Sequence, residues 1–335
     1  MPRSLPPGDV RLMSGPWPGD DRPHRIIRPM HLVIPYASAM DPQARAVLAD
    51  LQLPALDRAL ADLGAGPRSG GDEYSPALPQ ERLLATLAGL PEESPPPLAA
   101  WALGESAGTQ AWARLTPLHC DVGSDQVTAL DPAELGLDAA SSQAFFFEAL
   151  APLFPEEEGW ALMHQAPGQW FVAHERLQGQ ETASLDRVIH RNVDAWLPEP
   201  RQLLRLQMEM QMTLHGHPLN AAREQAGLRP VNSVWIWGCG SAAGHALPDG
   251  VEVDEQLRAA WITGDWTAWA EAWRALDARR IAPLLPALAA GTATLSLAGE
   301  RQALTLCPQP RSWTQRLWQQ LRPAHGQAAR LLESL

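Results

Sequence analysis

The run formed by residues 207–240 restricts the possible fold more than any other part of the sequence, because it joins LHGHPLNAAREQAG to VNSVWIWGCG. Its 231–237 stretch is apolar at both alternating sets of positions, which is typical of a central strand buried on both faces. The glycine-flanked tripeptide 238–240 predicts a tight turn at the end of that strand. Residues 201–214 and 220–226 have the composition and apolar spacing of helices. We therefore expect a sheet flanked by helices.

Short strand and helix patterns alternate along the rest of the chain. The apolar run that begins at Met30 is typical of a buried strand, and residues 160–174 have the pattern of a hairpin about an Ala-Pro-Gly-Gln turn. We interpret residues 41–63 as one helix, residues 64–79 as a loop and residues 98–113 as a further helix.

These patterns predict an α/β or α+β fold: a mixed sheet flanked by helices, with a β-hairpin and a C-terminal helical segment. Residues 1–29 combine several prolines with mixed charges, so we expect a disordered extension there. We expect residues 30–335 to form a single body with a soft boundary near residue 241.

Composition excludes several kinds of chemistry. All 26 positive charges are arginines, so the chain has no lysine for a Schiff base or a P-loop. The net charge of -12 argues against nucleic-acid binding, which needs positive charge to displace counterions. The three cysteines form no CxxC pair, which fits a reducing compartment. Without a recognisable signal peptide or bilayer-spanning apolar run, we expect a cytoplasmic protein with no membrane partner.

The segment LHGHPLNAAREQAGLRPVNSVWIWGCG resembles part of the archaeal-type, cofactor-independent phosphoglycerate mutases. From about Met30 onward, the chain is similar to bacterial regulatory proteins of the RpfE type. That similarity is carried by the strand at Met30, LTPLHCDVGSDQV, the 160–174 hairpin, LDRVIHRNVDAWLP and the 207–240 run. The resemblance implies a degenerate alkaline-phosphatase-like fold. If activity is retained, it implies interconversion of 2- and 3-phosphoglycerate with divalent Mn or Mg.

The first strand departs from the pattern of these mutases. The resemblance implies an Asp at the end of that strand, a Ser or Thr nucleophile, and later Asp and His ligands for two metal ions. Here residues 34–38 read IPYAS, and no Asp-rich run with spaced histidines follows Gly240. We therefore expect a catalytically degenerate, regulatory protein whose catalytic residues are unknown. It would bind a small anionic metabolite or a protein partner.

Candidate ligand-binding residues gather in and near the 207–240 run. Imidazoles can contact phosphate or metal, arginine can fork an anion, an aromatic pair can wall a pocket, and glycines allow close backbone approach. Each also has a structural interpretation, as a helix cap, an ion pair, a core residue or a turn. The candidates are His215, His217, Asn220, Arg223, Asn232, Trp235, Trp237, Gly238, Gly240 and Arg191.

Two alternatives stay open. An active metal-dependent mutase would need ligands from His119, Asp121 and Asp125, the weak metal candidates of the HCDVGSD run, together with the histidines near residue 216. A structural or protein-interaction module would use the tryptophans of residues 261–273 as its contact face. If those tryptophans are buried in a core, the second alternative loses its basis.

Overall fold

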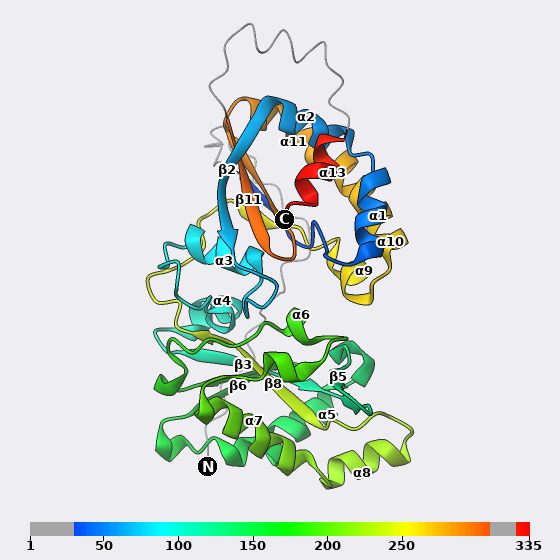
Figure 1. The fold of residues 1–335 in the computed structure, drawn as a ribbon. Helices are drawn as coiled ribbons and strands as arrows, with labels where there is room; N and C mark the ends of the chain where they lie inside the picture. Colours follow the sequence, from blue (N-terminus) through cyan, green and yellow to red (C-terminus); the bar gives the residue numbers. More distant parts are fainter. Residues whose placement is uncertain (1–29, 309–325) are drawn as a thin grey trace, which may run out of the picture.

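The computed structural model describes residues 30–308 and 326–335, which form two main sheets with helices packed around them (Figure 1). The predicted disordered extension, residues 1–29, lies outside the described residues. The larger sheet has five strands, in the order β2 (Leu63–Gly70), β11 (Gln302–Pro308), β10 (Ala293–Ala298), β1 (Met30–Ile34) and β9 (Val251–Val253). Strand β1 runs parallel to β9 and β10, whereas β11 runs antiparallel to β10 and β2, so the sheet is mixed.

The main apolar core lies on one face of this five-stranded sheet. The helices packed there are α1 (Pro42–Asp50), α2 (Pro54–Asp62), α9 (Arg258–Thr263), α10 (Trp266–Leu276), α11 (Ala282–Ala289) and α13 (Gln327–Leu332). Trp261, Trp269 and Trp273 are buried in this core with the leucines of β1 and β10. The hypothesis that the tryptophans of residues 261–273 form a contact face therefore loses its basis. Helix α3 (Pro79–Leu87) packs on the opposite face.

The second sheet is antiparallel, in the order β6 (Ala161–Ala166), β7 (Gln169–Ala173), β3 (Trp112–Leu118) and β8 (Ser233–Gly240). One face packs on α7 (Arg201–Leu214) and on the phenylalanines that follow α5 (Ala139–Ala144). The other face packs on α4 (Leu98–Leu103) and on the segment that contains α6 (Leu185–Val188). The ribbon of β4 (Cys120–Val122) and β5 (Val127–Ala129) and helix α8 (Pro218–Gln225) complete this part.

The predicted mixed sheet flanked by helices is confirmed, as are the 160–174 hairpin and the helix over 201–214. The chain enters the antiparallel sheet with β3 and leaves it after β8, so the expected soft boundary near residue 241 falls at this exit. Whether residues 30–335 fold as a single body stays a prediction. No helix in the described part of the chain is both long enough and apolar enough to cross a membrane.

Strand β8 corrects two expectations. It is buried on both faces as predicted, but it lies at an edge of its sheet rather than at the centre. Helices cover both of its faces, so a continuous apolar pattern reports burial and not position in the sheet. Gly238 and Gly240 belong to the strand instead of forming a turn after it, and the register with β3 shifts between Trp112 and Arg114.

Three further interpretations were wrong in part. Residues 41–63 form two helices, because the chain becomes extended at Leu51 and a new helix begins at Pro54. The expected loop over 64–79 contains most of β2, a glycine-rich edge strand whose composition hides its pairing. The helix expected over 98–113 ends at Gly104, and Trp112 begins β3.

Candidate functional site

The polar side chains predicted around the α7–α8 corner serve the local structure. The amide of Asn220 donates to the carbonyls of Leu214 and Val231 at 2.9 and 2.8 Å, and its Oδ1 accepts from the Val231 N–H. Arg223 donates to the carbonyls of Arg229 and Leu135. These bonds join α7 and α8 to the start of β8, and they use the groups that a ligand would need.

The two histidines of this corner have different positions. His217 caps α8, because its Nδ1 accepts from the Leu219 N–H at 3.3 Å. His215 ends α7 and is exposed. Among the described residues neither imidazole forms a hydrogen bond with another side chain, so their role as ligand contacts stays a prediction.

Asn232, Gly238 and Gly240 also have internal contacts. The Asn232 amide exchanges two hydrogen bonds with the backbone of Cys120. A Cβ at Gly238 would lie 2.9 Å from the Cβ of Leu98, and one at Gly240 would lie 3.2 Å from that of Pro97. The close approach that we expected for a ligand is made by the start of α4.

The weak metal candidates are only partly brought together. His119 Nε2 lies 3.0 Å from an oxygen of Asp121, and the other His119 nitrogen faces the Pro230 carbonyl at 2.8 Å. Asp125 is exposed in the turn between β4 and β5. Within residues 30–308 and 326–335, no group of three or more His, Cys, Asp and Glu side chains is placed to hold a metal.

A different set of polar side chains meets between the parts of the chain that form the two sheets. We call Tyr36, Arg114, Asp186 and Arg258 the junction cluster. Asp186 of α6 accepts from the hydroxyl of Tyr36, which follows β1, at 2.5 Å. Arg258, the first residue of α9, binds the same carboxylate through two nitrogens at 2.8 and 2.5 Å. One carboxylate from the antiparallel part of the chain therefore ties together two residues of the five-stranded part.

Burial and the Asp186 charge set the protonation of this cluster. Burial and then the neighbouring Asp186 raise the pKa of Tyr36 well above its usual value, so its hydroxyl stays neutral and donates. Burial alone would lower the pKa of Arg258. Its hydrogen bonds to Asp186 and the Asp186 charge outweigh burial and raise this pKa above its usual value. Tyr36 also has a positive φ of 57°, which is strained for a tyrosine. The Trp269 indole N–H, bound to the Tyr36 carbonyl at 3.0 Å, helps to hold this conformation.

Arg114 of β3 is the charged member of the junction cluster that forms no ion pair among the described residues. Its guanidinium lies 4.7 Å from the ring centre of Trp237 and 5.6 Å from that of Phe171. Among the described residues it forms no side-chain hydrogen bond or ion pair. Burial lowers the pKa of Arg114, and the nearby Asp186 opposes this shift. The predicted site residue Trp237 therefore does lie at this junction, where its indole N–H binds Thr116.

Two more arginines flank the cluster. Arg191, a predicted site residue, pairs with Glu300 at 2.8 Å and lies over the Trp261 ring. Arg187 is fully buried 5.6 Å from the Trp196 ring centre, and none of its three guanidinium nitrogens has a hydrogen-bond partner within the described chain. The indole of Trp235, another predicted residue, binds the Ala183 carbonyl just before α6.

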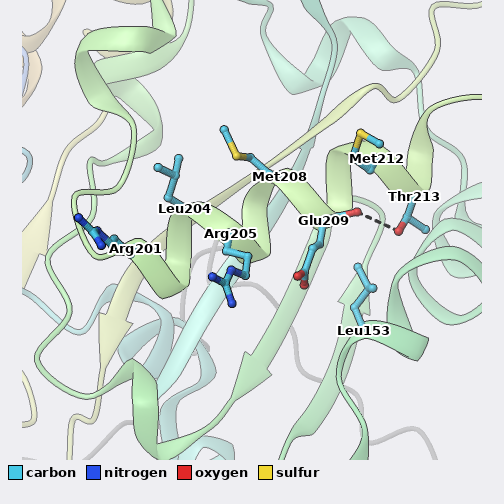
Figure 2. A pocket seen from close by; sticks show the side chains of 8 residues that line it. All are labelled: Leu153, Arg201, Leu204, Arg205, Met208, Glu209, Met212 and Thr213. Atoms are coloured by element: carbon cyan, nitrogen blue, oxygen red, sulfur yellow. Dashed lines mark hydrogen bonds between the residues drawn. The ribbon is translucent and has the colours of Figure 1, made fainter.

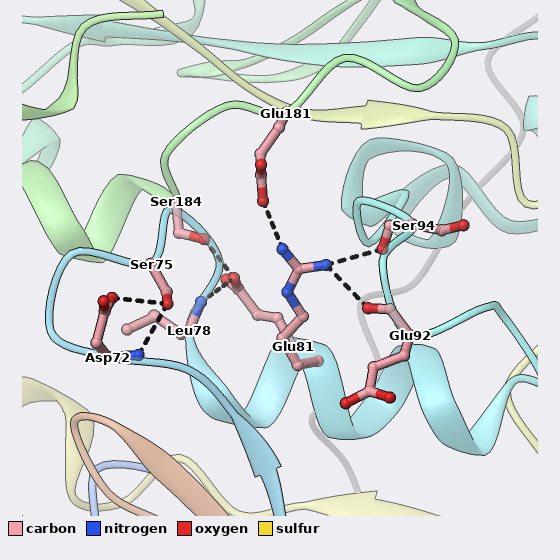
Figure 3. Close-up of polar contacts among 9 residues, drawn as sticks. Asp72, Ser75, Leu78, Glu81, Glu92, Ser94, Glu181 and Ser184 are labelled. Carbon is pink, nitrogen blue, oxygen red and sulfur yellow. Dashed lines mark hydrogen bonds and ion pairs between the residues drawn. The ribbon is translucent and has the colours of Figure 1, made fainter. Parts of the chain in front are cut away.

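Helix α3 is bound through side chains to the segment just before α6 (Figure 3). The Glu81 carboxyl accepts from the Ser184 hydroxyl and from the Leu78 N–H, and Arg82 pairs with Glu181 at 2.5 Å. Burial raises the pKa of Glu81 to about 7, although its two hydrogen bonds oppose the shift. Near neutral pH, this carboxyl is therefore protonated in part of the molecules and ionised in the rest.

The raised pKa of Glu81 makes the stability of the fold depend on pH. The folded state retains this proton up to about pH 7, whereas the ordinary value is 4.5. The contribution of Glu81 to stability is therefore fully present below pH 4.5 and is lost as pH rises through about 7, by on the order of 3 kcal/mol. Glu81→Gln should remove this loss. In urea unfolding, the free energy of unfolding of the variant relative to that of the native chain should therefore be higher at pH 8 than at pH 5. If the free energies of unfolding of the variant and the native chain change equally between the two pH values, the assignment is contradicted. Glu224→Gln on the exposed side of α8 is the control.

Sequence reasoning did not select Arg114, Arg187 or Arg258 as site residues. Tyr36 and the LDRVIHRN segment were noted, but not as parts of one site. The signal that was available is the pair of opposite charges at Asp186 and Arg187, inside a short apolar helix. Nothing in the spacing of residues 36, 114, 186 and 258 indicates that they meet.

Comparisons with known proteins give distant structural neighbours. No family model and no curated protein matches the sequence. A protein from Pyrococcus horikoshii, PH0037, is 13% identical with a TM-score of 0.43, over 84% of this chain and 88% of that one. The cofactor-independent phosphoglycerate mutase from Thermoplasma acidophilum is 11% identical with a TM-score of 0.34, over 83% and 89%. At these values neither neighbour identifies the ligand or the reaction of this chain. The fold and the site of the chain itself define a mixed α/β protein with an arginine-lined junction.

Proposed function

We propose that this chain is a mutase-like regulatory protein of the RpfE type, catalytically degenerate, which binds a small phosphorylated or carboxylated metabolite at the junction cluster. The observation that carries the proposal is Arg114, a half-buried guanidinium with no anionic partner among the described residues. Two aromatic rings position it, and a planar guanidinium suits carboxylate and phosphate oxygens. We place the protein in the cytoplasm, in accord with its three free cysteines.

The charges around Arg114 favour an anion. Four arginines, 114, 187, 191 and 258, lie in or beside the junction. Within residues 30–308 and 326–335 their ion pairs are with Asp186 and Glu300, and the exposed Glu255 also acts on Arg114 and Arg258. The junction also lies beyond the carboxyl end of β1, which runs parallel to both of its neighbours. Ligands of open α/β sheets bind characteristically at that end of the strands.

The state of Tyr36 supports the degenerate part of the proposal. Tyr36 is the hydroxyl-bearing residue closest along the chain to the end of β1, and burial raises its pKa well above the usual value. A nucleophile needs the opposite shift or an adjacent base. The Asp186 carboxylate that accepts the hydrogen bond of this hydroxyl is already bound by two nitrogens of Arg258. These residues are arranged to bind and to orient.

The proposal predicts that Arg114→Met weakens anion binding. With 3-phosphoglycerate and citrate as probes, titration calorimetry should give a Kd that rises at least about tenfold in the variant, which corresponds to about 1.4 kcal/mol. Arg45→Met removes the same charge from the exposed side of α1 and should leave the Kd unchanged. Equal binding by Arg114→Met, or no binding of either probe to the native chain, would reject the site.

One observation favours an active metal-dependent mutase as the second candidate, namely the 3.0 Å contact between His119 and Asp121. A coupled assay for conversion of 3- to 2-phosphoglycerate, with and without Mn²⁺, separates the two candidates. Metal-dependent turnover that His119→Ala abolishes would replace the degenerate assignment. We expect no turnover under either condition.

A further inference from the structure

An apolar stripe on α7 faces away from the sheet that the helix covers (Figure 2). Met208 and Met212 are 53% and 75% exposed, although the opposite side of the helix is buried in the core. With Leu204 and Leu153 they line a groove of about 500 Å³. Flexible methionine side chains on a surface are well suited to contact with a partner, because they adapt to its shape.

The charges beside this stripe are arranged with one sign at each end. Arg201 and Arg205 lie toward the start of α7, and Glu209 lies toward its end (Figure 2). Arg205 and Glu209 are four residues apart, yet neither side chain forms an ion pair within the described part of the chain. Both charges are therefore available to a partner at the rim of the groove.

We propose that this face of α7 binds the α7 of a second copy of the chain, with the two helices antiparallel about a two-fold axis near Gln207. In that arrangement Arg205 of each copy meets Glu209 of the partner subunit, so one contact is made twice, as closed two-fold symmetry requires. Met208 lies between the two charge pairs and excludes water from the centre, and Leu204 lies just outside them. A parallel arrangement would instead place like charges together.

The charge pattern favours a second copy over other occupants. An acidic peptide would satisfy Arg201 and Arg205 but would repel Glu209, and a basic peptide would do the reverse. A helix with the same charges in the opposite direction satisfies both Arg205 and Glu209, and the chain's own α7 is such a helix. One helix face is smaller than a standard protein interface, so the dimer is a weak one with a Kd on the order of 10–100 µM.

Sedimentation equilibrium of the full chain, over a range of about 1–500 µM, tests this dimer. The native chain should change from monomer to dimer, and Met208→Glu should stay monomeric because it buries a charge in the centre. Arg205→Glu and Glu209→Arg should each raise the Kd at least about tenfold, since each creates two like-charge contacts. The double variant should return to within about threefold of the native Kd.

Two controls separate the contact from general effects. Glu224→Arg makes the same charge reversal on α8, away from the groove, and should leave the Kd unchanged. Thermal unfolding at about 1 µM should show that each variant is folded. A native chain that is monomeric at every concentration, or a double variant no better than its single parents, would overturn the proposal. Because this surface is separate from the junction cluster, the result is independent of anion binding.

Discussion

Gly238→Ala should lower the free energy of unfolding by about 3 kcal/mol, one of the two largest effects that we expect from a single substitution in this chain. The backbone at Gly238 has a φ of 66°, which costs an L-residue about 1 kcal/mol. The new Cβ would also lie 2.9 Å from the Cβ of Leu98 and 3.1 Å from the backbone nitrogen of Ala99. Neither atom is the free end of a flexible side chain, so α4 must move, and overpacking of this kind costs about 1–3 kcal/mol.

Gly216→Ala is the matched control for this substitution. Gly216 has almost the same φ, 69°, but nothing lies within 4 Å of a Cβ placed there. It should therefore lose only the conformational part, about 1 kcal/mol. Urea unfolding of both variants measures the difference. Equal losses would show that α4 does not approach β8 as closely as the distances indicate.

Asp186→Ala should destabilise the protein by about 3 kcal/mol, because it removes the carboxylate that joins α6 to Tyr36 and Arg258. The substitution leaves the Tyr36 hydroxyl without its acceptor and Arg258, whose side chain is 32% exposed, without its counterion. Removing one partner of a buried pair costs about 3–5 kcal/mol, and the partial exposure of Arg258 places the expected loss at the lower end.

The exposed pair between Arg58 and Asp62 provides the comparison for Asp186. Its N–O distance is 3.0 Å, and both side chains face solvent on α2. Asp62→Ala should change stability by no more than about 0.5 kcal/mol, as is usual for surface pairs. Chemical denaturation gives both values, and Tyr36→Phe adds a measure of the hydroxyl alone, expected near 1 kcal/mol. If Asp186→Ala behaves like Asp62→Ala, the junction cluster does not join the two sheets energetically.

Local signals in the sequence were sufficient for several elements. Asp41 accepts from the backbone N–H groups of Gln43 and Ala44, so α1 begins where a capping residue followed by proline predicts it. Gly168 has a φ of 71° in the turn between β6 and β7, as its place after Pro167 predicted. In each case the interaction that decides the structure spans only a few residues.

Elements that depend on distant partners were misread. Residues 64–70 have the composition of a loop, and they form β2 only because the distant β11 pairs with them. The expected turn at residues 238–240 is part of β8, because β3 continues to pair with the strand there. Composition and spacing cannot report such contacts, since the partner lies more than a hundred residues away.

The sequence by itself determined the α/β class, the arginine-only cation set and the helices and hairpins that arise from short-range interactions. Only the tertiary structure decided which polar side chains meet. Asn220 and Arg223 belong to a corner that is satisfied internally, whereas Tyr36, Arg114, Asp186 and Arg258 come from four distant parts of the chain. The physical reason is that a charge acquires its environment from whatever the fold packs against it. Burial, pairing and the absence of a partner are properties of that packing and not of neighbours along the chain.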